Sequence, residues 1–334
     1  MFSHFFAIDW SARNVPSPAK PSKDAVWLAE GSARQGSEVA TRYFRTRQAC
    51  VAYVEARLLA LHGERVLVGW DFSFGYPKGF AKALRLKGKP AWRAVWDCID
   101  QLVTDEPDNR NNRFCVGAML NQRTGAPAGP FWGVPTGQSG IFLGSRKDFN
   151  YPVPTRRGLL NERRATERLH SRMQPAWKLA YTGSVGSQAL LGIPRVRYLR
   201  DHSGLSDRSF IWPFEEHWAG NAGAMILHAE IYPSMITLPL TDAIRDREQV
   251  ESYVRWLRDR QQREELRGLL HRPWGTGDKL HRRVVNHEGW VLGLKSGRGE
   301  DSCGGRKKRI FAPFKPTSAH DITQDSLRTD LRLS

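Results

Sequence analysis

The sequence predicts an α/β fold in which helices flank a mixed sheet. Three short apolar runs near the N-terminus, 4–10, 24–30 and 39–45, have the length and composition of strands and are separated by turn-forming residues. Apolar residues then recur at helical spacing over 47–62, and a fourth strand-like run follows at 65–72. A helix in this place is a crossover into the next strand, so the chain begins with three strands, a helix and a strand.

The middle of the chain predicts a large helical and loop insertion on this sheet, from about 77 to 207. Its apolar pattern is less regular, and it contains long stretches rich in Gly, Pro and aromatic residues. Amphipathic helices are expected at 92–103 and 113–122, and a charged helix at 161–173. A Gly/Ser turn then opens a short helix that Pro194 should interrupt.

The last part of the chain predicts the remaining elements of the sheet, followed by a tail. The expected elements are strands at 209–214 and 224–232, a long helix at 247–270, and a last helix from 277 to about 294. The sequence therefore predicts one domain over 1–294. Residues 295–334 are rich in Gly, Ser and charged residues, and we expect a disordered basic tail there.

The composition indicates a large core and an anionic partner. The 334 residues are 40% hydrophobic and carry a formal net charge of +17, which favours nucleic acid, although a basic surface also serves phosphorylated small ligands or solubility. The four cysteines form no Cys-x-x-Cys pair and follow no secretory leader, which argues against a zinc knuckle or disulfides and predicts a cytoplasmic location. No apolar run reaches the roughly 20 residues of a membrane span.

Four acidic residues stand in apolar segments, where a carboxylate is costly unless a cation, a proton or hydrogen-bond donors compensate it. They are Asp9 in FFAIDWSA, Asp71 in VGWDFSFG, Glu230 in ILHAEIYP and Glu288 in VVNHEGWV. Mg²⁺ and Mn²⁺ prefer carboxylate oxygens, and two such ions about 3.5–4 Å apart can activate water in phosphodiester cleavage. We expect Asp9, Asp71 and Glu230 to bind Mg²⁺ or Mn²⁺, with Glu288 as a fourth catalytic acid.

Strand geometry gives these acids their neighbours. Alternate side chains of a strand share a face, so Asp9 lies with Ala7, and Asp71 with Gly69. These small neighbours are expected to leave room for a metal ion. Each acid also has a structural alternative, in which the aspartates cap the turns after their strands and Glu230 pairs with an arginine.

The turn GSVGSQ is the candidate substrate-binding segment, because backbone N–H groups at the start of a helix can bind a phosphate. Basic residues near it would add positive charge. The candidate substrate-binding residues are Lys178, Ser184, Ser187, Gln188, Arg163 and Arg164. The turn has no Walker lysine, so an ordinary helix cap and solvated surface cations are the alternatives.

The segments AIDWSA, VGWDFSFGYPKGFA, GSVGSQALLGIP, AEIYPS and HEGWVLGL occur in this order over most of 3–294. They resemble a bacterial family of uncharacterised proteins described as predicted ribonuclease H-like nucleases. The resemblance implies a fold of the ribonuclease H or retroviral-integrase type, with metal-binding roles for Asp9, Asp71 and Glu230. This chain has Glu288-Gly289 where many relatives have an Asp-Ala pair.

The sequence thus favours a metal-dependent nuclease that hydrolyses phosphodiester bonds of nucleic acid. One alternative is a nucleotide- or phosphometabolite-binding enzyme of the actin-like branch, for which AIDWSAR lacks the expected glycine. Some close relatives carry labels from cobalamin or molybdopterin biosynthesis, although no residue here points to that chemistry. A third possibility is a catalytically silent protein that binds nucleic acid.

Overall fold

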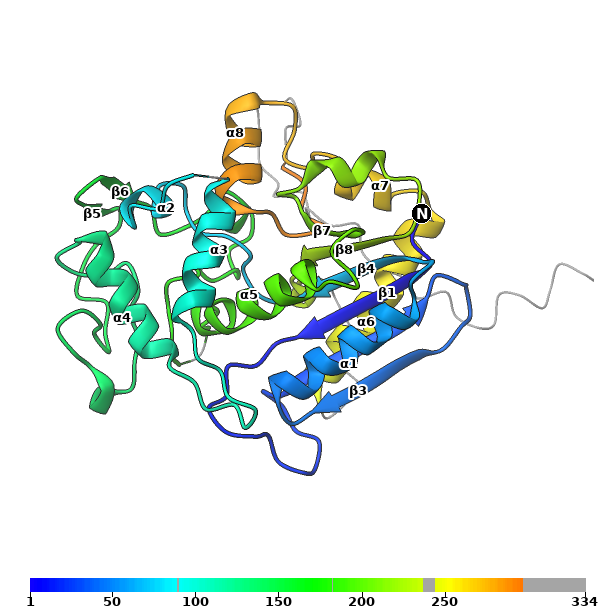
Figure 1. Cartoon of the computed structure of the whole chain (residues 1–334), viewed down its shortest axis with the longest axis horizontal. Coiled ribbons are helices and arrows are strands. Elements are labelled where there is room, and N and C mark those ends of the chain that lie inside the picture. The colour runs from blue at the N-terminus through cyan, green and yellow to red at the C-terminus, as the bar shows by residue number, and fades with distance from the viewer. Residues whose placement is uncertain (89, 182, 237–243, 297–334) are drawn as a thin grey trace, which may run out of the picture.

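The computed structural model describes residues 1–88, 90–181, 183–236 and 244–296 (Figure 1). At its centre is a six-stranded sheet in the order β3-β2-β1-β4-β8-β7. The strands are β1 (His4–Asp9), β2 (Val26–Ser32), β3 (Val39–Phe44), β4 (Arg65–Trp70), β7 (Ser209–Trp212) and β8 (Met225–Glu230). The pairs β1–β2 and β2–β3 are antiparallel, whereas β1–β4, β4–β8 and β7–β8 are parallel. The predicted mixed α/β sheet is confirmed.

Helices cover both faces of this sheet, α1 on one face and α6 on the other (Figure 1). The helices are α1 (Arg47–Ala60), α2 (Phe80–Ala83), α3 (Ala91–Leu102), α4 (Arg113–Thr124), α5 (Gly186–Asp201), α6 (Arg245–Gln262), α7 (Leu266–Leu270) and α8 (Asp278–Arg283). Short helical turns follow at Thr136–Gln138, Thr166–Arg168, Glu216–Gly220, Pro233–Met235 and Val284–Glu288, and β5 (Val153–Thr155) and β6 (Gly158–Leu160) form a separate hairpin. No described helix has the length and apolar character of a membrane span.

The two faces of the sheet bury two separate groups of apolar side chains, as the alternation along a strand requires. Phe6 and Ile8 of β1 pack into the core formed with α1, α3 and α5. Phe5 and Ala7 pack into the core formed with α6. Asp9, two positions after Ala7, therefore belongs to the face that α6 covers.

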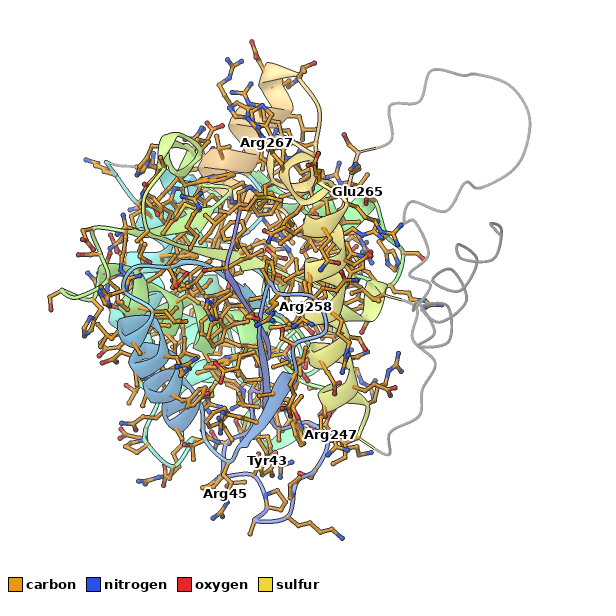
Figure 2. The ribbon with its side chains drawn as sticks, turned by 90° about the vertical axis from the view of Figure 1, so that its right-hand side faces the viewer. Tyr43, Arg45, Arg247, Arg258, Glu265 and Arg267 are labelled. Atoms are coloured by element: carbon orange, nitrogen blue, oxygen red, sulfur yellow. The ribbon has the colours of Figure 1, made fainter. Side chains whose placement is uncertain are left out.

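Helix α6 is fixed to the antiparallel edge of the sheet by Arg258. Its guanidinium donates to the carbonyl oxygens of Ser32, at 3.0 Å, and Ser37, at 2.9 Å. Figure 2 shows Arg258 between the helix and the strands, with Arg247 near the helix N-terminus. This contact and the apolar side chains of the α6 core therefore hold the helix against the sheet.

The prediction of a charged helix at 161–173 is wrong, since this segment is irregular apart from the turn Thr166–Arg168. The backbone N–H of Arg164 donates to the Glu167 carboxylate, and both side chains are buried in an ion pair. These side-chain bonds replace helical backbone bonds. A charged, apparently helical pattern is thus overridden by burial of its ions.

Two other helix predictions also differ from the structure. Helix α5 runs through Pro194 without interruption, because residues on both sides of it, including Ile193 and Val196, are fully buried and packing outweighs the lost hydrogen bond. The last helix ends in the π-turn Val284–Glu288, well before residue 294. Gly289, which follows this turn, has a φ of 69°, a backbone conformation that favours glycine. Most of the predicted tail, 297–334, lies outside the described residues.

Candidate active-site cleft

Asp9 and Asp71 are brought together by the register of two parallel strands. Ile8 of β1 pairs with Trp70 of β4, and each aspartate is the next residue along its strand direction. The backbone N–H of Asp71 donates to the carbonyl oxygen of Ile8 at 2.9 Å. Both side chains therefore leave the sheet at the same edge, and both belong to the face that α6 covers.

Asp246 completes this acidic group and was not predicted. It lies in the first turn of α6, and its carboxylate accepts a hydrogen bond from the backbone N–H of Asp24 at 2.7 Å. The negative charge of Asp246 raises the pKa of both Asp9 and Asp71, which places it within electrostatic reach of each. An acid in the first turn of a helix is common for dipole reasons alone, so the sequence held no distinguishing signal for it.

The carboxylates of Asp9 and Asp71 are not neutralised by the protein. Burial raises the pKa of Asp9 well above its ordinary value, as do Asp71, Asp246 and Asp24, and the backbone N–H of Trp10 offsets only part of this. Burial, Glu230 and Asp246 raise the pKa of Asp71 to about 8. Neither carboxylate has a cationic partner among the described residues. Such an arrangement is stable only when a proton or a bound cation supplies the missing positive charge.

A cleft of about 560 Å³ opens beside Asp9. Its acidic wall carries Asp9, Asp24 and Asp246, and the opposite wall includes Tyr181 and Ser184. The structure thus brings part of the predicted substrate-binding turn to the same cleft as the first predicted acid. Gln188 also lines the cleft, and its side-chain amide donates to the carbonyl oxygen of Trp10, which ties α5 to the end of β1.

The other predicted substrate-binding residues face elsewhere. Ser187 is buried, accepts from Arg113 Nε at 3.1 Å and donates to the carbonyl oxygen of Leu179 at 2.5 Å. Lys178 lies over the ring of Trp132, 5.4 Å from its centre. Arg163 donates to backbone carbonyl oxygens of its own segment. None of these three lines the cleft beside Asp9.

Arg164 and Glu230 form a buried pair instead of facing a substrate or a metal. Two nitrogens of Arg164 donate to the two oxygens of Glu230, at 2.8 and 2.6 Å. The remaining Arg164 N–H groups reach Glu167, Ser73 and the backbone carbonyl oxygen of Glu288. All of its donors are used, so the structural alternative considered for Glu230, pairing with an arginine, is the contact that the structure shows.

The sheet register places Glu230 and Asp71 on opposite faces of the sheet, although the two remain neighbours: Glu230 raises the pKa of Asp71, and both line a small cavity of about 30 Å³ together with Arg164. Glu230 pairs with Trp70, whereas Asp71 is one residue further along. Neighbouring residues of a strand point to opposite faces, so Glu230 lies with the core of α3 and α5 while Asp71 lies with that of α6. The space expected beside Asp71 at Gly69 is also occupied, since a β-carbon there would lie 2.6 Å from Ile231.

Glu288 is a structural anchor of the irregular segments. It is fully buried, and its carboxylate accepts from the backbone N–H groups of Lys78 and Ala165, each at 2.7 Å. Arg283 lies 2.7 Å from the same carboxylate. The backbone of Glu288 also packs closely on Gly75: a β-carbon added at Gly75 would lie 2.5 Å from the carbonyl group of Glu288. Glu288 therefore holds three segments together and does not line the cleft.

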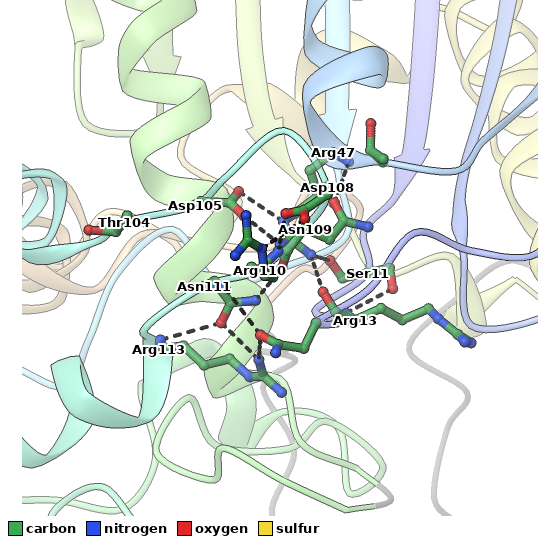
Figure 3. Close-up of polar contacts among 12 residues, drawn as sticks. Ser11, Arg13, Arg47, Thr104, Asp105, Asp108, Asn109, Arg110, Asn111 and Arg113 are labelled. Atoms are coloured by element: carbon green, nitrogen blue, oxygen red, sulfur yellow. Dashed lines mark hydrogen bonds and ion pairs between the residues drawn. The ribbon is translucent and has the colours of Figure 1, made fainter.

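The loop that follows β1 is fixed by a buried arginine, as Figure 3 shows. Arg47 donates to the backbone carbonyl oxygens of Ser11, at 3.0 Å, and Arg13, at 2.8 Å, and its charge is balanced by Asp105. Asn109 accepts from the backbone N–H of Arg47 and donates to the carbonyl oxygens of Val15 and Arg45. Because Ser11 and Arg13 line the cleft, this network holds one wall of it in place.

The donor chemistry of the cleft fits a hard divalent cation. Mg²⁺ and Mn²⁺ bind carboxylate oxygens, and Asp9 and Asp71 offer such oxygens without an ion-pair partner among the described residues. Within the described residues, however, no three His, Cys, Asp or Glu side chains converge closely enough to form a ready ligand cluster. Asp9 and Asp71, at the ends of their strands, and Asp246, in the first turn of α6, would therefore have to draw closer around an ion.

Comparison of the chain with protein-family models, with curated proteins and with solved structures finds no match.

Proposed function

We propose that this chain is a metal-dependent phosphodiesterase of the ribonuclease H-like type that acts on nucleic acid. The observation that carries the proposal is the acidic group of Asp9, Asp71 and Asp246: Asp9 and Asp246 line an open cleft, and Asp9 and Asp71 are buried carboxyls whose pKa values are raised. The strand order, in which three antiparallel strands precede a parallel crossover next to β1, supports the ribonuclease H-like assignment. The formal net charge of +17 supports an anionic polymer as substrate.

Asp9, Asp71 and Asp246 are the residues that would hold Mg²⁺ or Mn²⁺. This set replaces Glu230 of the sequence prediction by Asp246, because both carboxylate oxygens of Glu230 already accept hydrogen bonds from Arg164. When bound, such an ion supplies a Lewis acid for the phosphoryl oxygen and a water of lowered pKa. The protein itself positions the ligands. The backbone N–H of Asp71 is bound to the carbonyl oxygen of Ile8, and the Asp246 carboxylate accepts from the backbone N–H of Asp24.

The remaining walls would position the substrate. Arg13 and Ser184 line the cleft together with Asp9, and they offer a cation and a hydroxyl to a phosphate. The α5 N-terminus adjoins Ser184, so its backbone dipole favours a negative group on the same side. A strand lying in the cleft would thus meet both the carboxylates and these donors.

The test is cleavage of a panel of labelled oligonucleotides, single-stranded and duplex, DNA and RNA, by the purified full-length chain. Cleavage with Mn²⁺ or Mg²⁺ that stops on addition of a chelator is the expected result. Absence of cleavage across the panel, together with measurable Mn²⁺ binding, would overturn the activity. Oligonucleotide binding without Mn²⁺ binding would favour the catalytically silent alternative.

Metal affinity should increase with pH. The pKa of Asp71 is about 8, so at pH 6 its carboxylate is mostly protonated and a cation must displace that proton. Because the pKa of Asp9 is raised as well, the apparent affinity for Mn²⁺ should rise by about tenfold to a hundredfold per pH unit between pH 6 and 8. Calorimetry in two buffers of different ionisation heat would measure both the affinity and the released proton. An affinity that is constant over this range would contradict the assignment of Asp71.

Asp71→Asn should stabilise the metal-free protein. The folded-state pKa of Asp71 is raised above its unfolded value, so the folded state binds the extra proton and loses stability as pH rises toward 8. Asn removes the repulsion, and at pH 8 we expect a gain of about 1 kcal/mol, or about 2 °C in Tm. Melting curves in chelator measure this change. Added Mn²⁺ should raise the Tm of the native chain and not that of the variant, and a lower Tm for the variant in chelator would contradict the prediction.

A further inference from the structure

A second concave site lies away from the carboxylate cleft, between α2, the start of α3 and the β5–β6 hairpin. Figure 1 shows α2 and the β5–β6 hairpin at one end of the molecule, on the side of α3 that faces away from the sheet. The site has a volume of about 290 Å³ and shares no lining residue with the cleft beside Asp9. This size approaches that of pockets for small organic ligands.

The walls of this second site, which we call the basic pocket, carry only positive charges. They present Lys82, Arg85, Lys87 and Arg157, and no acidic residue lines it. All four side chains belong to exposed residues. None of the four has an acidic partner within the part of the chain that the structure describes. Four converging cations without a counter-charge favour a ligand with more than one negative charge, as a phosphate group has.

The floor of the basic pocket is apolar. It is formed by Ala81, Leu86, Ala91 and Ala94, with the half-buried ring of His287 at one side. A small cavity of about 10 Å³ continues inward past Ala81 and Ala91, and Tyr76 lines it. The Tyr76 hydroxyl is buried and has no hydrogen-bond partner. A ligand that suits these walls has a flat apolar part beside its negative group and a polar atom within reach of the floor.

Arg85 occupies a backbone position that normally belongs to glycine. It follows α2 with a φ of 60°, and its N–H bonds to the carbonyl oxygen of Lys82 while the N–H of Leu86 bonds to that of Ala81. These two bonds form the C-terminal motif in which the left-handed residue is usually Gly. An arginine there is conformationally strained, and its side chain lines the basic pocket.

We propose that the basic pocket binds the phosphate of a nucleotide, with Arg85 and Arg157 contacting the phosphate from opposite walls and the base lying on the alanine-lined floor. The nucleotide is either free or one residue of a nucleic-acid strand, since both present the same phosphate and base. This inference does not require the phosphodiesterase activity, because the pocket is separate from the acidic cleft.

The test uses the full-length chain in chelator at low salt, with AMP, inorganic phosphate and a short oligothymidylate as calorimetric probes. Arg85→Gly should weaken binding at least about tenfold while leaving the Tm unchanged or higher, because glycine suits the left-handed backbone. Arg272→Gly is the matched control. It also removes an exposed arginine with positive φ, outside the basic pocket, and should change affinity less than twofold.

A second pair of variants covers the opposite wall. Arg157→Gln should weaken the same binding, whereas Arg156→Gln, at the adjacent residue outside the basic pocket, should not. Binding of AMP that both wall variants weaken supports a free nucleotide, and oligothymidylate binding alone supports a strand. Undiminished binding in Arg85→Gly and Arg157→Gln, equal loss in the control variants, or no binding of any probe would overturn the proposal.

Discussion

Asp9→Asn is expected to lower metal-dependent cleavage of an oligonucleotide by at least about 10³-fold, which corresponds to about 4 kcal/mol of transition-state stabilisation. Asp9 stands at the centre of the acidic group, since Asp71, Asp246 and Asp24 all raise its pKa. Asn keeps the shape and removes the charge, so the cation is bound more weakly and is less well positioned while the β1 backbone is unchanged. Single-turnover cleavage with saturating Mn²⁺ measures the effect.

Two comparisons make this result specific. Asp207→Asn, at an exposed position outside the cleft, should leave cleavage unchanged. Asp246→Asn should lower activity with little loss of stability, whereas Glu230→Gln should lower stability because it weakens the pair with Arg164. Full activity of Asp9→Asn would contradict the assignment of the acidic group as the catalytic centre. Normal stability of Glu230→Gln would contradict the structural role assigned to Glu230.

Arg164→Met is expected to destabilise the protein by about 3–5 kcal/mol, the usual cost of removing one partner of a buried ion pair. The side chains of Arg164, Glu167 and Glu230 are each at most 3% exposed, so the two carboxylates would remain buried without their counter-charge. Urea denaturation should show a lower midpoint with an unchanged m-value. Arg164→Lys should recover only part of the loss, because an ammonium cannot make the bidentate contact.

The neighbouring residue provides the control for this change. Arg163 carries the same charge on the same segment but donates only to backbone carbonyl oxygens. Arg163→Met should therefore cost about 1 kcal/mol per lost hydrogen bond at most. Adding Glu230→Gln to Arg164→Met should return part of the stability. Equal stability of Arg164→Met and the native chain would contradict the buried-charge argument.

The sequence predicts the adjacency of Asp9 and Asp71 but not that Glu230 lies on the other face of the sheet, paired with Arg164. Each aspartate stands at the end of a recognisable strand, and neighbouring parallel strands end at one edge. The face on which Glu230 lies depends on a register of one residue between β4 and β8. No pattern within either strand fixes that register, so three acids with similar local sequence appear equivalent until the strands are paired.

Arg164 and Asp246 mark the other limits of prediction. Around Arg164 the spacing of charged residues favours a helix, and only the buried partners from distant segments change that outcome. Asp246 has an ordinary local reason to stand in the first turn of α6, which conceals its place beside Asp9. Both residues acquire their importance from contacts far along the chain, which local propensity does not contain.

The contacts of Arg164 also determine how the molecule should lose its structure. One guanidinium connects a residue of the long excursion between β4 and β7 to Glu230 of β8, to Ser73 and to the backbone of Glu288. If either the excursion or the sheet unfolded alone, a buried charge would be left without its ion-pair partner. Slow amide hydrogen exchange should consequently report one common opening energy for both regions, and excising the excursion should leave a sheet that does not fold.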